Sequence, residues 1–198
     1  MGETVQRMGV FKGGMKQEVM MDISNKKILD VTCGGRSIWI NKNHPLCLYC
    51  DRRDVEYEQT FGKANPATRH IRVHPDMLAD FTDLPFEDNT FHLVVFDPPH
   101  IISEKGNNRW LTKAYGHFAT KEEALESVRG GVSECMRVLK PYGVLILKWA
   151  ETSIPTPEII KAIGYIPLFG HKSGKKSGTN WMCFMKEDKE EQLCLKNY

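Results

Sequence analysis

The chain contains the stretch Phe91-His92-Leu93-Val94-Val95-Phe96-Asp97-Pro98-Pro99-His100 near its middle. Its first six residues form an apolar run with the length of one buried strand. Two consecutive prolines cannot continue a parallel strand or a helix, so the chain has to leave the sheet in a fixed, extended conformation. The stretch therefore predicts a central strand whose carboxyl end holds a carboxylate, Asp97, beside rigid backbone carbonyls. Open α/β sheets bind their ligands at this end of the strands.

Apolar segments recur on both sides of this strand and alternate with turn-forming or helical segments. The clearest helical pattern runs over residues 121–139, where apolar residues recur at helical spacing, and Thr120 with Glu123 predicts a capping box at its start. Strands that alternate with helices indicate parallel pairing and right-handed crossovers. The other expected strands are Ile28–Val31, Leu46–Cys50, Ile71–Val73, Gly143–Lys148 and a closing pair, Tyr165–Phe169 and Trp181–Met185.

We therefore expect one doubly wound α/β domain over residues 26–186. An arm or short helix over residues 1–25 precedes it, and a charged tail over residues 187–198 follows it. At 198 residues the chain is long enough for a full core, and its hydrophobic content of 41% is that of a globular protein. No apolar stretch approaches the roughly 20 residues of a membrane span, and residues 1–21 lack a signal-peptide core. Six scattered cysteines fit a reduced protein, so we expect a cytoplasmic location without membrane association.

Acidic residues follow three of the expected strands. Asp30 precedes a turn that contains Thr32, Gly34 and Gly35, which is the usual cofactor position in this architecture. Asp51 lies 21 residues later, the spacing at which an acid can bind ribose hydroxyls. Asp80 next to Phe81 could accept from an adenine amino group while the ring packs against the base.

These motifs, in this order, resemble those of class I S-adenosylmethionine (SAM)-dependent methyltransferases over about residues 26–186. Within that fold, Asp97-Pro98-Pro99-His100 is similar to the Asp-Pro-Pro-aromatic signature of enzymes that methylate exocyclic amines of nucleobases. The resemblance implies a Rossmann-like, seven-stranded, mostly parallel sheet with an antiparallel last strand. It also implies SAM as cofactor and the following site residues: Asp30, Thr32, Gly34, Gly35, Arg36, Asp51, Asp80 and Phe81 for the cofactor, with Asp97, Pro98, Pro99 and His100 for catalysis.

Two positions depart from the family pattern. Arg36 stands where many relatives have a glycine; it either pairs with the methionyl carboxylate of the cofactor or lies outside the site. His100 replaces the aromatic residue, and an imidazole can stack on a base, donate a hydrogen bond or transfer a proton near neutral pH.

The expected chemistry is a displacement at a sulfonium methyl group by an aromatic amine, which is a poor nucleophile. If Asp97 and the Pro98 carbonyl accept the hydrogens of the amine, electron density on its nitrogen rises and the nitrogen points at the methyl group. Asp97, His100 or water could take the proton that is released. A base within a duplex would have to flip out to reach the site.

The segment after the motif and one basic loop supply candidate substrate contacts. Trp110 and Tyr115 are candidates to stack on a base and Arg109 to bind a phosphate, although both aromatic residues could instead cover the sheet edge. Lys175 and Lys176 belong to a loop that either binds phosphate or is a solvated hairpin tip. Cys47 and Cys50 point to opposite faces of a strand, so we expect buried structural cysteines and no metal site.

The first interpretation is thus an N-methyltransferase for a nucleobase amine in RNA or DNA. A net charge of +2 neither requires nor excludes a nucleic acid partner. The space between the motifs holds no separate target-recognition domain, which favours RNA, a short DNA motif or a base that a protein partner presents. Two alternatives stay open: a methyltransferase for a free nucleotide or other small molecule, and a catalytically silent SAM-binding scaffold.

Overall fold

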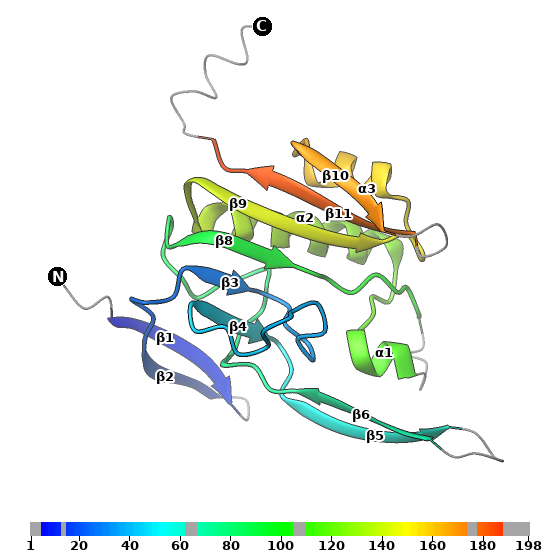
Figure 1. Cartoon of the computed structure of the whole chain (residues 1–198), viewed down its shortest axis with the longest axis horizontal. Coiled ribbons are helices and arrows are strands. Elements are labelled where there is room, and N and C mark those ends of the chain that lie inside the picture. The colour runs from blue at the N-terminus through cyan, green and yellow to red at the C-terminus, as the bar shows by residue number, and fades with distance from the viewer. Residues whose placement is uncertain (1–4, 13–14, 62–66, 105–109, 174–177, 188–198) are drawn as a thin grey trace, which may run out of the picture.

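The computed structural model describes residues 5–12, 15–61, 67–104, 110–173 and 178–187. Within these ranges the chain forms a central sheet, two separate hairpins and helices on one side of the sheet (Figure 1). The strands are β1 Val5–Lys12, β2 Met15–Asp22, β3 Ile28–Asp30, β4 Cys47–Asp51, β5 Val55–Phe61, β6 Ala67–Val73, β7 Met77–Leu78, β8 Phe91–Phe96, β9 Leu139–Ala150, β10 Phe169–Ser173 and β11 Thr179–Met185. The helices are α1 Trp110–Tyr115, α2 Lys121–Val138 and α3 Thr156–Ile163.

The central sheet has seven strands in the order β10-β11-β9-β8-β3-β4-β7. Strands β9, β8, β3, β4 and β7 pair in parallel, and β11 pairs antiparallel with both β9 and β10. This confirms the expected mostly parallel sheet in which the last strand of the chain is antiparallel. The chain order reverses at β3, next to β8, and the carboxyl ends of β3, β4 and β8 therefore meet at the position where this architecture binds ligands.

The apolar run that predicts the central strand is confirmed residue for residue as β8, Phe91–Phe96. Strand β9 alternates between fully buried and half-buried residues because only one of its faces packs on helices. The helix pattern is confirmed as α2, and the Thr120 hydroxyl accepts from the Glu123 amide at 3.1 Å, as the predicted capping box requires.

The crossovers run on both faces of the sheet, but the described helices cover only one of them. Helices α2 and α3 lie behind the sheet in Figure 1, under β8, β9 and β11. On the other face the connections after β3 and β4 are a turn-rich loop, residues 31–46, and the β5–β6 hairpin, which extends away from the sheet. From β3 the chain moves to β4 on one side, and from β8 it moves to β9 on the other side, so the two crossovers run in opposite directions across the sheet. Because both crossovers are right-handed, they pass over opposite faces of the sheet.

Three expected elements are different in the structure. The first strand of the expected closing pair, Tyr165–Phe169, is displaced: β10 begins at Phe169 and ends at Ser173. Ile71–Val73, predicted as the third strand of the sheet, is the end of β6 and pairs with β5, and the sheet strand at that position is the short β7. Its alternating pattern fits a hairpin as well as a sheet strand, since the pattern does not specify the pairing partner. The arm or short helix expected over residues 1–25 contains the antiparallel hairpin β1–β2.

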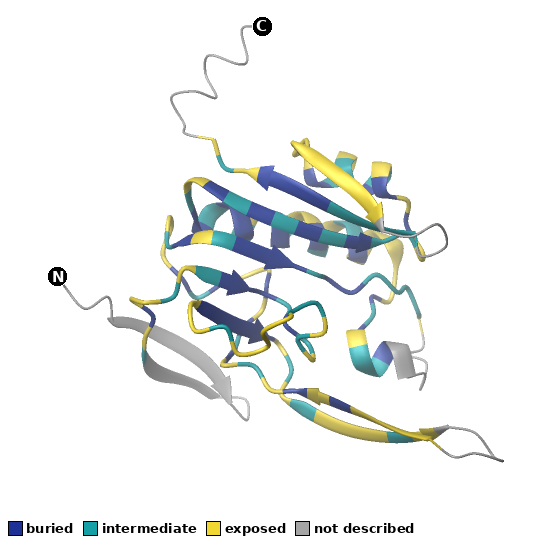
Figure 2. Cartoon of the chain, viewed as in Figure 1, coloured by how far each residue is buried: buried dark blue, intermediate teal, exposed yellow. Residues whose placement is uncertain are grey.

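The core lies between the central strands and helices α2 and α3, where the buried residues of Figure 2 gather. Gly131 allows α2 to approach the sheet closely, because a Cβ at this position would lie 2.7 Å from the rings of both Phe81 and Phe96. Both phenylalanines lie next to the ligand-binding edge: Phe96 directly precedes Asp97, and Phe81 follows β7. Strand β10 forms the exposed edge of the sheet (Figure 2). Among the described residues, no helix is long and apolar enough to cross a membrane.

Candidate active site

A cavity opens at the carboxyl ends of β3, β4 and β8, beside α1. Figure 1 shows where these strand ends and α1 lie. Connecting segments, the end of β4 and the end of α1 contribute to its wall, which brings together residues far apart in the sequence. Lining residues from the predicted set are Thr32, Gly34, Gly35, Asp51, Phe81, Asp97, Pro99 and Tyr115.

The loop after β3 forms one wall of the cavity through its backbone. Gly34 adopts a left-handed conformation, φ +48°, and its amide donates to Asp51 Oδ2 at 3.0 Å. A glycine suits this position because the left-handed region disfavours residues with a Cβ. The contact joins the ends of β3 and β4 and turns the loop backbone toward the cavity.

Asp30 stabilises this loop through hydrogen bonds and does not line the cavity. Its side chain accepts from Trp39 Nε1 at 2.6 Å and from the Thr32 amide at 3.1 Å. Only 1% of the residue is exposed, and burial raises its pKa to about 7, against the lowering effect of the Trp39 hydrogen bond. In this structure Asp30 holds the loop; a direct contact with a cofactor stays a prediction.

Asp51 is buried at the cavity wall and is bound by an arginine that the sequence did not single out. Arg53 Nε donates to Asp51 Oδ1 at 3.0 Å and Arg53 Nη2 to Oδ2 at 3.2 Å, a two-point contact of the kind that guanidinium and carboxylate groups favour. The same guanidinium donates to the carbonyls of Lys113 and Ala114 in α1. Arg53 therefore links the acid predicted for ribose binding to the helix that borders the site.

Asp97 follows β8 and faces the cavity, and its backbone amide donates to the Thr32 hydroxyl at 2.8 Å. Its carboxylate pairs with Lys148 Nζ at 2.5 Å, and the side chains are only 14% and 19% exposed. Burial raises the pKa of Asp97, and the Lys148 charge opposes that rise. Pro98 and Pro99 are buried. Gly116, at φ +78°, packs closely against Pro99, because a Cβ at this position would lie 3.2 Å from Pro99 Cγ.

His100 is half-buried behind the cavity wall and faces Tyr115, at a ring distance of 6.1 Å. Burial lowers the pKa of His100, whereas the Asp97 charge and a hydrogen bond to the Pro98 backbone raise it. His100 therefore lies beside the motif and against Tyr115, outside the residues that line the cavity.

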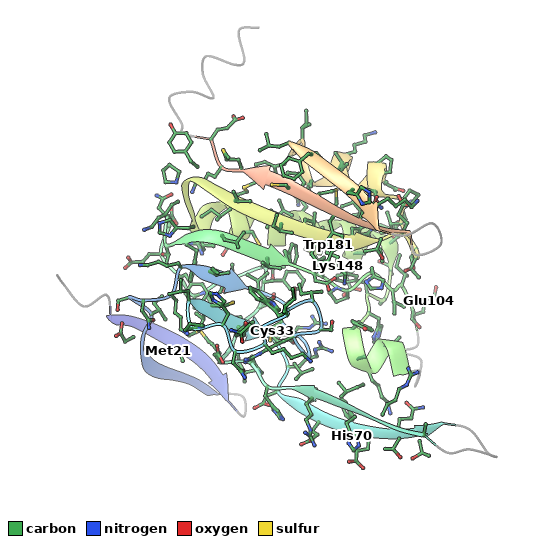
Figure 3. The ribbon with its side chains drawn as sticks, viewed as in Figure 1. Met21, Cys33, His70, Glu104, Lys148 and Trp181 are labelled. Atoms are coloured by element: carbon green, nitrogen blue, oxygen red, sulfur yellow. The ribbon has the colours of Figure 1, made fainter. Side chains whose placement is uncertain are left out.

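Lys148 contacts Asp97 from outside the residues that line the cavity, and Trp181 lies beside Lys148; neither was among the predicted residues. They are direct cross-strand partners on β9 and β11, and Lys148 Nζ lies 5.9 Å from the Trp181 ring centroid (Figure 3). One sequence signal pointed to Lys148: a lysine near the end of the apolar run Gly143-Val144-Leu145-Ile146-Leu147 needs a buried partner. That its partner is Asp97, 51 residues away, follows only from the pairing of β8 with β9.

Other predicted residues lie away from the cavity or outside the described residues. Arg36 donates to the His74 carbonyl at 3.0 Å and pairs with Asp76 at 2.9 Å, which uses its guanidinium in loop packing. Asp80 accepts from the amide and hydroxyl of Thr82. Arg109, Lys175 and Lys176 and the side chain of Trp110 lie outside the described residues.

The cysteines of the described part are free and buried. Cys47 packs with Cys33 and Tyr49, whereas Cys50 belongs to the main core, as expected for residues on opposite faces of a strand. Burial raises the pKa of the Cys47 thiol to about 12, so it stays protonated at neutral pH. Among the described residues no group of three or more His, Cys, Asp and Glu side chains is placed to hold a metal ion.

No family model and no curated protein matches the sequence. Solved structures that are similar to the chain include the following three. PH0226 protein from Pyrococcus horikoshii OT3 gives a TM-score of 0.50 at 13% identity and covers 82% of each chain. The cyclase SpnF gives 0.43 at 15% identity, and a SAM-dependent methyltransferase from Leishmania major gives 0.45 at 15% identity.

The chain is covered to 77% by the cyclase and to 82% by the Leishmania protein, and it spans 55% and 65% of their respective lengths. Together with the observed strand order, the match to the Pyrococcus protein shows the fold predicted from the sequence. That fold is an α/β domain with a seven-stranded, mostly parallel sheet and an antiparallel last strand.

Proposed function

We propose that the chain is a SAM-dependent N-methyltransferase that acts on an exocyclic amino group of a nucleobase in RNA or DNA. The main support is the position of Asp97: a half-buried carboxylate, followed by two buried prolines at the end of β8, faces the cavity formed by the loop after β3. A fixed acceptor at this place suits an amine better than it suits a hydroxyl, because an NH2 group has two hydrogens to donate.

The cavity wall has a donor and acceptor set that fits the cofactor. Asp51 offers a carboxylate for ribose hydroxyls, Gly34 and Gly35 offer a close backbone wall, and Phe81 offers a ring for the adenine. A ribose bound to Asp51 would replace at least one of the hydrogen bonds from Arg53. When bound, SAM supplies an electrophilic methyl group on a sulfonium.

The residues of the chain then act on the amine. Asp97 and the Pro98 carbonyl accept its two hydrogens, which raises electron density on the nitrogen and aligns its lone pair with the methyl group. Transfer of the methyl group to the nitrogen would leave the amine positively charged, and the amine would then lose one proton. Asp97 is placed to receive that proton, because its pKa is raised by burial and its carboxylate is in direct contact with the amine in this arrangement.

The test is transfer of a labelled methyl group from SAM to total RNA, unmethylated DNA, free nucleotides and protein, with Asp97→Ala and Asp97→Asn alongside. We expect label in one nucleic acid and a loss of at least about 100-fold in kcat for both variants, since they remove an interaction formed with the reacting group. SAM binding by calorimetry and the unfolding temperature are the controls for an intact fold.

The pattern of label separates the other possibilities. Label only in free nucleotides would replace the polymer substrate by a small one. Absence of label in every fraction, with SAM bound, would contradict the enzymatic proposal and favour a scaffold. Undiminished transfer by Asp97→Asn would show that this carboxylate is not part of the reaction.

A further inference from the structure

The ion pair between Asp97 and Lys148 leaves polar atoms unused on both partners. Lysine has three N–H donors, and within the described residues Asp97 is the only hydrogen-bond acceptor that Lys148 contacts. The lysine bonds to Oδ2 of Asp97, and no protein donor from the described residues contacts Oδ1. The pair therefore presents an acceptor, Oδ1, and a donor, Nζ, side by side. Asp97 lines the cavity, and Lys148 lies directly beside it.

Lys148 is fixed in this place by more than Asp97. Its Nζ lies 5.9 Å from the Trp181 ring centroid, within the range of a cation–π contact, and its side chain is only 19% exposed. The ammonium therefore does not depend on Asp97 alone, and the carboxylate can bind a substrate amine while the lysine stays beside it.

We propose that Lys148 is a specificity-determining residue: it donates to the ring nitrogen next to the target amine on the Watson–Crick edge. This inference rests on the proposed function. Adenine carries its N6 amine next to N1, and cytosine its N4 amine next to N3, so each offers a donor and an acceptor in adjacent positions. Guanine carries a hydrogen on N1, beside its N2 amine. On that edge the N1–H donor would face the Lys148 ammonium, which is also a donor.

A mispaired donor at such a buried position is costly, because neither group can find another partner after water has been excluded. Lys148 therefore favours adenine or cytosine and disfavours the N1 edge of guanine. A lysine that only neutralised Asp97 would make no such distinction between bases.

The first measurement is the identity of the methylated nucleoside, determined by mass spectrometry after transfer to total RNA and unmethylated DNA. Methyl groups on the adenine N6 or cytosine N4 support the inference. Methyl groups on the guanine N2 would leave the proposed function standing and overturn the inference alone. Absence of methylation on any base would remove the proposed function, and the inference with it.

The second measurement removes the ring acceptor from the substrate. With an adenine target, an oligonucleotide that contains 1-deazaadenine, which has C–H in place of N1, should lower kcat/KM of the wild-type protein about 10- to 100-fold. With a cytosine target, 3-deazacytosine replaces it. A 7-deazaadenine oligonucleotide keeps N1 and is the matched control, with an expected change of less than about threefold.

The protein variants complete the cycle. In Lys148→Met, transfer to adenine should fall, and the ratio between adenine and 1-deazaadenine should approach one, because the donor is gone from both reactions. Lys148→Gln keeps a neutral donor and should retain part of the ratio. Equal rates of the wild-type protein on adenine and 1-deazaadenine would overturn the inference even if neither variant folds, as would an unchanged ratio in a folded Lys148→Met.

Discussion

At the scale of single residues, the carboxylates of Asp30 and Asp97 are in opposite situations. Within the described residues, the Asp30 side chain accepts from two neutral donors, Trp39 Nε1 and a backbone amide, whereas Asp97 has a cationic partner in Lys148. Burial raises the pKa of both, and a positive charge opposes the rise only at Asp97. The two acids therefore suit different tasks: Asp30 stabilises a loop, and Asp97 is ready to accept a hydrogen bond or a proton.

The raised pKa of Asp30, about 7 instead of 3.8, makes stability depend on pH. Between these two values the folded state holds a proton that the unfolded state has lost, so the free energy of unfolding should decrease as pH rises from about 4 to about 7. In Asp30→Asn, which keeps an oxygen acceptor for Trp39, this part of the decrease should be absent. Urea unfolding of both proteins at pH 5 and pH 8 measures it, and parallel pH profiles would contradict the assignment.

At the scale of elements, α2 positions the site through its contact with the sheet. Its two adjacent glycines differ in their surroundings. A Cβ at Gly131 would lie 2.7 Å from Phe81 and Phe96, whereas at Gly130 the nearest atom would be Thr82 Cγ2 at 3.7 Å. Since Phe81 lines the cavity and Phe96 precedes Asp97, the close approach at Gly131 links helix packing to the geometry of the site.

Alanine at these two positions should act in opposite directions. Gly130→Ala gains helix propensity without a clash and should stabilise the protein by about 0.5–1 kcal/mol. Gly131→Ala gains the same helix propensity, but overpacking against the two rings costs about 1–3 kcal/mol. Because this cost is generally larger than the gain, we expect a net loss of about 1 kcal/mol in the free energy of unfolding. Chemical unfolding compares the pair directly. A stabilised Gly131→Ala would show that the phenylalanine rings yield without cost.

At the scale of the whole molecule, the sheet divides the candidate site into two parts. The loop after β3 and the end of β4 provide the predicted cofactor contacts, and the ends of β8, β9 and β11 provide Asp97, Lys148 and Trp181. The two parts belong to strands on either side of the reversal in strand order. Loss of one part should therefore leave the other formed.

Ligand-induced stabilisation tests this division. A ligand at 100 times its Kd adds about 2.7 kcal/mol to the free energy of unfolding, so saturating SAM should raise the unfolding temperature of the wild-type protein by several degrees. Asp97→Asn should show the same rise, and Asp51→Asn a smaller one. An equal rise in all three proteins would indicate that the cofactor does not contact Asp51.

The amino-acid sequence by itself determined the central strand Phe91–Phe96, the helix from Lys121 with its cap and the strand-helix alternation that gives the sheet. Periodicity and end signals are local, and they act wherever a segment is placed. Only the tertiary structure decided that Ile71 to Val73 pairs within a hairpin, that Arg53 binds Asp51 and that Lys148 reaches Asp97. Pairing partners and buried charge contacts depend on which segments the fold brings together, and residues distant in the sequence have no local pattern that specifies them.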